Sequence, residues 1–92
     1  MLSDDELTLF VAEMCEDFQL PPYLDDAVIR RSAKEKAERL IFLKDDADFT
    51  ADMQARSLLK NAVYYDINHR YEEFEANYAP LILSWQLGGK TT

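Results

Sequence analysis

The two residue types that most often carry nucleophilic or metal chemistry occur once each in this chain, as Cys15 and His69. A catalytic cysteine needs a histidine within hydrogen-bond reach and a third group that orients it. Cys15 continues the first predicted helix beside its apolar stripe, which favours a structural thiol. His69 has Asp66 before it and Glu72 and Glu73 after it, but a structural zinc site needs several cysteine or histidine ligands. We therefore predict neither a catalytic pair nor a metal site.

The acidic segment that contains Asp46 and Asp48 resembles the start of a calcium-binding loop. However, Ala51 stands where the sharp turn of such a loop needs glycine, and Ser57 stands where the bidentate glutamate belongs. The segment instead predicts a turn between helices, with Asp48 or Thr50 as the helix cap. The chain also has no glycine-rich phosphate loop and no carboxylate pair in a desolvating setting. We predict that it is not an enzyme and binds no cofactor.

The positions of proline and glycine predict an all-α fold. Proline occurs only at positions 21, 22 and 80, and glycine only at 88 and 89, so the long segment between residues 23 and 79 lacks both helix breakers. We predict a short N-terminal helix, a long antiparallel helical hairpin and a C-terminal tail. The predicted helices are about residues 4–18, 25–44 and 51–77, in a helical domain of residues 1–79, and the tail is residues 80–92.

The starts of the first two helices carry specific signals. Ser3 and Glu6 have the spacing of a capping box, and Asp25 is placed to cap the second helix. Apolar residues then recur with helical spacing, which predicts the core. The predicted core positions are Leu7, Phe10, Val11 and Met14; Ile29, Ala33, Ala37, Leu40 and Ile41; and Ala55, Leu58, Leu59, Ala62, Val63, Ile67, Tyr71, Phe74 and Tyr78.

The pattern of the tail allows two conformations. Leu83, Trp85 and Leu87 alternate with polar residues, as in a strand. The same residues fit a short helix, with Pro80 in its first turn and Gly88 just past its end. A strand would have no partner within a helical chain and would dock on another protein by strand addition. We expect a protein that lacks residues 80–92 to keep a folded helical core.

Composition and charge exclude several classes of protein. The 92 residues carry 18 acidic and 10 basic side chains, a formal net charge of −8. This charge disfavours direct binding to nucleic acid and to anionic membranes. A hydrophobic fraction of 48% excludes a disordered chain. The sequence shows no secretory signal and no apolar run near the ~20 residues of a membrane span.

The charge is distributed in blocks. Residues 1–29 contain eight acidic residues and no basic one, whereas residues 30–44 contain six basic residues and two acidic ones. The blocks either neutralise each other within one chain, with the first helix near the basic face of the second, or meet across repeated contacts between subunits. Two interpretations are also open for the third predicted helix, because its apolar stripe is widened by Tyr64, Tyr65 and Tyr71. That helix is either packed between two others or carries a second face for other subunits.

Two stretches of the chain resemble the small head-tail connector (head completion) proteins of tailed bacteriophages. One is residues 25–29 followed by Ala33 and Ala37. The other is residues 55–59 running into residues 64–68, and it continues through Phe74, residues 77–78 and residues 81–83. The resemblance covers nearly the whole chain in layout, and its motifs are apolar and aromatic spacings.

The resemblance implies a structural role in the virion. Family members form a ring of about a dozen subunits beneath the portal, extend the DNA channel and carry the tail or a stopper. The expected partners are therefore copies of this chain, the portal protein and a tail or stopper protein. Assembly would take place in the bacterial host cytoplasm and the product would lie in the neck of the virion. An acidic chain agrees with a channel through which DNA passes without specific binding.

We assign two surfaces on this basis. The predicted inter-subunit residues are Tyr64, Tyr65, Asn68, Tyr71 and Glu75, with Arg30, Arg31 and Lys34 as charge partners. The predicted portal-docking residues are Leu81, Leu83, Trp85 and Leu87.

Two other functions remain alternatives. The first is a small acidic helical inhibitor that mimics DNA and binds a basic protein, with its carboxylates in residues 1–29. The basic block at residues 30–44 argues against a DNA mimic. The second is a helical adaptor domain of a host complex.

Overall fold

The computed structural model describes residues 2–87 and contains four helices in that range. They are α1 (Asp4–Asp17), α2 (Asp26–Leu43), α3 (Met53–Ile67) and α4 (Tyr71–Gln86), and no strand occurs among the described residues. The all-α prediction is therefore confirmed. No helix within residues 2–87 is both long enough and apolar enough to cross a membrane.

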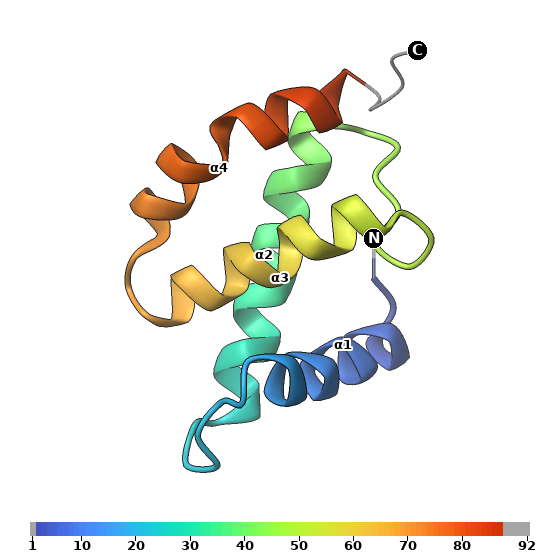
Figure 1. The fold of residues 1–92 in the computed structure, drawn as a ribbon. Coiled ribbons are helices and arrows are strands. Elements are labelled where there is room, and N and C mark those ends of the chain that lie inside the picture. Colours follow the sequence, from blue (N-terminus) through green and yellow to red (C-terminus); the bar gives the residue numbers. More distant parts are fainter. Residues whose placement is uncertain (1, 88–92) are drawn as a thin grey trace.

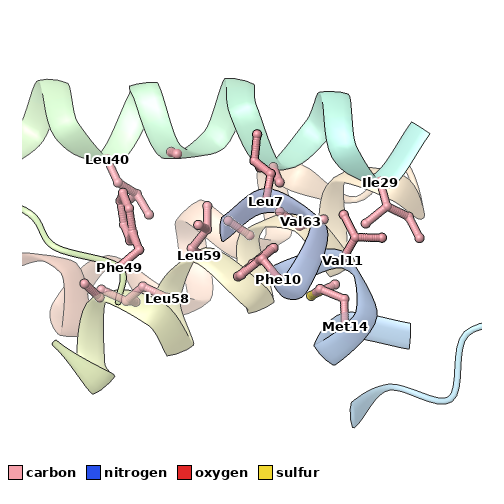
Figure 2. Packing of buried hydrophobic residues seen from close by; sticks show 14 of the residues in the cluster. Leu7, Phe10, Val11, Met14, Ile29, Leu40, Phe49, Leu58, Leu59 and Val63 are labelled. Atoms are coloured by element: carbon pink, nitrogen blue, oxygen red, sulfur yellow. The ribbon is translucent and has the colours of Figure 1, made fainter. Parts of the chain in front are cut away.

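The helices are arranged around α2. Figure 1 shows α1 and α3 crossing α2 in the same direction, while the C-terminal half of α4 lies beside the C-terminal end of α2. In Figure 2, α1 and α3 lie on the same side of α2, with the buried side chains between them. The third helix thus crosses the second and is shorter than predicted, so the structure does not have the long antiparallel hairpin that the sequence suggested.

The predicted caps of the first two helices are confirmed. Ser3 Oγ accepts a hydrogen bond from the backbone N–H of Glu6 at 3.2 Å, and Glu6 Oε1 accepts one from the N–H of Ser3 at 2.8 Å. Asp25 Oδ1 accepts from the N–H of Ala27 at 2.9 Å. Each cap satisfies backbone donors that have no partner inside the helix, which fixes where the helix begins.

The cap of α3 differs from the prediction. Asp52, rather than Asp48 or Thr50, caps this helix, and its Oδ1 accepts from the N–H of Gln54 at 3.0 Å. Asp48 Oδ1 instead accepts from the hydroxyl and N–H of Thr50 and from the N–H of Ala51. These bonds, with that from the Thr50 hydroxyl first, hold the pKa of Asp48 below its usual value. The Asp48 carboxylate organises the turn before the helix, which leaves Asp52 as the cap.

The predicted helix at 51–77 is wrong, because the chain turns between Ile67 and Tyr71. The N–H of Arg70 donates to the carbonyl of Tyr65 at 2.8 Å, and the N–H of His69 donates to that of Asp66 at 3.0 Å. This pair of bonds is the Schellman motif that ends many helices, and it places its C′ residue in the left-handed region. That residue is His69, with φ of 59°. Glycine usually occupies this position. Histidine occupies it here, so no glycine marks the turn in the sequence.

The end of α1 has the same construction. The N–H of Leu20 donates to the carbonyl of Cys15 at 3.1 Å, and Gln19 has φ of 50°. Pro21 and Pro22 follow directly and prevent the helix from continuing. Both turns that reverse the chain after a helix are therefore made without glycine.

The segment predicted as a separate tail belongs to the fold. Helix α4 continues through Pro80 to Gln86, so no break separates residues 1–79 from the described part of the tail. Of the two tail conformations, the structure has a helix in residues 80–86, as the continuation of α4. Residues 88–92 of the predicted tail lie outside the described residues.

The core contains the predicted apolar stripes and one unpredicted loop residue. Figure 2 shows buried side chains of α1, α2 and α3 together with Phe49, which comes from the loop before α3 and belongs to the same cluster. Ile41, Ile67, Tyr71 and Tyr78 are only half-buried. The buried residues are Leu7, Phe10, Val11, Met14, Ile29, Ala33, Ala37, Leu40, Phe49, Ala55, Leu58, Leu59, Ala62, Val63, Phe74 and Trp85.

Trp85 connects the end of α4 to the rest of the core. Its side chain is 1% exposed, and its Nε1 donates to Asp52 Oδ2 at 3.1 Å. The Nζ of Lys44 lies 5.9 Å from the Trp85 ring centroid, and Gln86 Nε2 donates to the carbonyl of Leu43 at 3.2 Å. The expectation that the chain folds without residues 80–92 is therefore withdrawn, because their removal takes away a large core side chain.

We predict that Trp85→Ala lowers the free energy of unfolding by about 3–5 kcal/mol, since it removes a buried indole and leaves a cavity. The matched control is Leu83→Ala, two residues away on the same helix, where the side chain is 57% exposed. We expect the control to change stability by about 0.5 kcal/mol or less. Urea unfolding followed by circular dichroism measures both, and equal midpoints for the two variants would show that Trp85 does not hold the core.

We also predict that His69→Gly stabilises the protein by up to about 1 kcal/mol, because glycine adopts the left-handed conformation without steric cost. Ala76→Gly, at an exposed position inside α4, is the control and should destabilise by about 1 kcal/mol. Thermal unfolding compares the two. A lower melting temperature for His69→Gly would contradict the assigned turn.

Candidate assembly surfaces

The acidic side chains of α1 are neutralised mainly by α3. Lys60 Nζ lies 2.7 Å from Asp17 Oδ2 and 2.8 Å from Glu13 Oε1. The guanidinium of Arg56 contacts both oxygens of Glu13, at 2.8 and 3.1 Å. Arg56 also donates to the carbonyl of Phe49 at 2.9 Å, which ties the preceding loop to this group. Internal neutralisation, one of the two alternatives from sequence, thus occurs here, but the basic partners lie in α3.

Only one base of the predicted charge partners on α2 is engaged by α1. Arg30 Nη2 lies 3.3 Å from Asp4 Oδ1, and Arg30 Nη1 donates to Thr8 Oγ1 at 3.1 Å. Arg31 and Lys34 are exposed and form no ion pair within residues 2–87. These two bases are therefore free to meet an acidic group of another molecule.

The wide stripe formed by the tyrosines of α3 is explained by contacts on two sides of the helix. Tyr64 stacks on Phe18 with ring centroids 4.5 Å apart, on the side of α1. Tyr65 lies 5.9 Å from Phe74 and 6.0 Å from Tyr78, on the side of α4. These contacts favour the intramolecular alternative for the tyrosines, and they leave only part of each ring exposed.

The other predicted inter-subunit residues also have contacts inside the chain. Asn68 Nδ2 donates to the carbonyl of Tyr64 at 2.7 Å, and Glu75 pairs with Arg39 at 3.2 Å. Lys36 Nζ lies 4.0 Å from the ring centroid of Tyr71. Burial is the first cause that raises the pKa of Tyr71. The structure therefore does not gather the eight predicted residues into one open patch.

Three of the four predicted portal-docking residues are exposed, and one is not. Leu81, Leu83 and Leu87 are 50%, 57% and 76% exposed on α4. Trp85 lies in the core, so its assignment to a docking surface is corrected. The strand-like alternation of these residues hid the difference, since a helix turns Trp85 inward and Leu83 and Leu87 outward.

The C-terminal half of α4 forms the least charged surface of the described chain. Residues 76–87 include no acidic or basic side chain, in a protein in which 30% of residues are charged. Their inner side contributes Tyr78, Ile82 and Trp85 to the core. The exposed residues of this segment are mostly apolar, and the polar ones among them are uncharged: Ala76, Asn77, Ala79, Pro80, Leu81, Leu83, Ser84, Gln86 and Leu87. An exposed helix surface with several large apolar side chains often binds a protein, so this surface is the best candidate for docking.

A second exposed apolar residue was missed from the sequence. Phe42, near the end of α2, is 79% exposed. Its position opposite the buried stripe of Ala33, Ala37 and Leu40 is the signal that would have identified it. A groove of about 400 Å³ runs beside this part of α2, and its lining includes Leu7 and Ile41.

The residues first considered for chemistry lie in different elements of the fold. Cys15 is half-buried in α1, and burial is the main cause that raises the pKa of its thiol. His69 is exposed in the turn between α3 and α4. Within residues 2–87, no three histidine, cysteine or carboxylate side chains come together in a way that could hold a metal ion.

Comparison with known proteins returned no family model, no curated protein and no solved structure that matches the chain. The assignment of function therefore depends on the residues and surfaces described above.

We predict an acid-sensitive contact between α1 and α3. Hydrogen bonds from Lys60 and Arg56 lower the pKa of Glu13 below its usual 4.5. A carboxyl with a lowered folded-state pKa stabilises the fold above its unfolded pKa, and this contribution is lost as the pH falls through the folded value. The free energy of unfolding should therefore fall below about pH 4.5, and Glu13→Gln should reduce that dependence.

Urea unfolding between pH 3 and pH 7 measures this effect. Glu16→Gln, on the exposed side of α1, is the matched control and should leave the pH dependence as in the parent protein. An unchanged pH profile in Glu13→Gln would contradict the assigned role.

Proposed function

We propose that this chain is a non-enzymatic assembly protein, and specifically a head-tail connector subunit of a tailed bacteriophage. The observation that carries the proposal is the uncharged, exposed outer side of α4, because it is a helical surface that needs a protein partner. The sequence resemblance to the connector family supplies the partners. They are copies of this chain in a ring, the portal protein and a tail or stopper protein.

The distribution of charge supports a structural role over a DNA-mimic role. A mimic needs carboxylates that are free on one face, whereas Glu13 and Asp17 are engaged by Arg56 and Lys60 and Asp4 is engaged by Arg30. The net charge of −8 supports a channel wall that DNA passes without sticking, because it offers no attraction by counterion release. In this function the protein would be assembled in the host cytoplasm and retained in the virion neck.

The proposal predicts capture of a portal protein. A tagged chain, expressed together with the genes that neighbour its own, should recover a portal protein and a tail-side protein identified by mass spectrometry. The triple variant Leu81→Asp/Leu83→Asp/Leu87→Asp should lose this recovery, because charge at the exposed leucines of this segment opposes apolar docking. The single variant Leu9→Asp, at an exposed leucine of α1, is the control and should retain it.

One outcome would overturn the proposal, and a second would overturn the assignment of its docking surface. Recovery of a nuclease or repressor that added DNA displaces would favour the DNA-mimic function. Equal recovery of the portal protein by the triple variant and by the parent chain would remove α4 from the docking surface.

A further inference from the structure

We infer that the outer side of α4 in one copy of this chain packs along the outer side of α2 in a second copy, in a head-to-tail contact. The inference deepens the proposed function, on which its place in a ring depends. It concerns two exposed stripes. The α4 stripe is Glu72, Ala76, Pro80, Leu83 and Leu87, and the α2 stripe is Arg31, Lys34, Glu35, Glu38 and Phe42, which are all exposed.

The α4 stripe changes from acidic to apolar along the helix. Residues three or four apart share a face of a helix, which places the five members in one row. Glu72 stands at the N-terminal end of the row, and none of the eight ion pairs of the described chain includes it. The neighbouring Glu73 is engaged by Arg70 at 2.6 Å. After Glu72, the α4 stripe contains only apolar residues.

The N-terminal end of the α2 stripe carries the opposite charge at the same spacing. Arg31 and Lys34 stand at its N-terminal end, and Phe42 stands at its C-terminal end. Arg31 precedes Phe42 by eleven residues, and Glu72 precedes Leu83 by eleven residues, which is about 16 Å along each helix. Two such stripes laid parallel bring the carboxylate of Glu72 to the two bases while Leu83 and Leu87 meet Phe42.

Charge and shape favour a second copy as the occupant of the α4 stripe. Each copy carries a net charge of −8, so most approaches between copies are repulsive. The parallel contact limits this repulsion, because it joins Glu72 to two bases and places Glu35 and Glu38 opposite the uncharged segment between Ala76 and Pro80. The groove of about 400 Å³ lies beside the same part of α2, with Ala37 and Ile41 in its lining, and offers space for a leucine side chain.

The contact is heterologous, because it joins two different surfaces of the same chain. A pair of copies keeps one unused α2 stripe, on one copy, and one unused α4 stripe, on the other, so the contact can repeat and close into a ring. Two three-turn helix faces bury less than a standard interface, which predicts weak association between two copies and stronger association in a closed ring. The inference assigns Leu83 and Leu87 to a second copy and leaves Leu81, about 160° away from Leu83 around the helix, for the predicted portal contact.

Sedimentation equilibrium with charge variants tests the inference. The parent chain should self-associate at high protein concentration. The variants Arg31→Glu/Lys34→Glu and Glu72→Lys should each raise the dissociation constant by about tenfold or more, since like charges then face each other. A mixture of the two variants should restore association, because the acidic α2 stripe of one then meets the basic α4 stripe of the other. The control is Glu16→Lys, which changes the charge by the same amount as Glu72→Lys but on α1. It should associate like the parent or more strongly.

The contact itself is tested by a disulfide between two variants in a Cys15→Ser background, Phe42→Cys and Leu83→Cys. Mixed under oxidising conditions, they should form a covalent heterodimer in higher yield than Leu9→Cys mixed with Leu83→Cys. Circular dichroism of every variant checks that the helices are retained.

Three results would overturn the inference. They are a parent chain that stays monomeric at millimolar concentration, charge variants whose mixture shows no restoration, and equal disulfide yields for the two cysteine pairs. Portal capture alongside any of these results would leave the proposed function standing. Self-association through these residues in a chain that captures no portal would leave the inference standing and overturn the proposed function.

Discussion

One carboxylate, that of Asp52, holds together the beginning of α3 and the end of α4. Its Oδ1 accepts from the N–H of Gln54 and so starts α3, while its Oδ2 accepts from Trp85 Nε1 at 3.1 Å. The buried indole needs a partner for its N–H, since an unpaired donor in the core is costly. Where Trp85 sits determines how α4 lies against the end of α2, and therefore which side of α4 faces outward. The apolar surface of α4 is a consequence of this anchored residue.

The sequence predicted those features that local chemistry determines. The caps at Ser3 and Asp25 and the buried stripes follow from hydrogen-bond donors and helical spacing within a few residues. The turn at His69 was not predicted, because a Schellman motif is marked in sequence by glycine and this one has none. The place of Trp85 was not predicted either, since burial against α2 and α3 is a property of the assembled core.

The candidate surface was predicted only in part, because it also depends on the assembled fold. The leucines of α4 were identified from composition, but their division into sides of a helix required knowledge that residues 80–86 continue α4. Phe42 was not predicted, because it lies outside the buried stripe of its helix and faces outward. The tyrosines of α3 were assigned to an interface, whereas Tyr64 stacks on Phe18 and Tyr65 packs against Phe74 and Tyr78 within the chain.

The single tryptophan also gives the molecule an optical reporter. Trp85 is buried, its N–H donates a hydrogen bond to a carboxylate, and Lys44 lies close to its ring. The emission maximum and the quenching of Trp85 therefore depend on how α4 packs on the core. The ring of Tyr78 lies on the same helix two turns earlier and can transfer excitation energy to the indole. Fluorescence therefore reports the detachment of α4 separately from the loss of helical structure, which is followed by circular dichroism. Detachment of α4 from α2 while the other helices stay intact would therefore be detected, without a chemical label, as a change in the wavelength and intensity of the tryptophan emission.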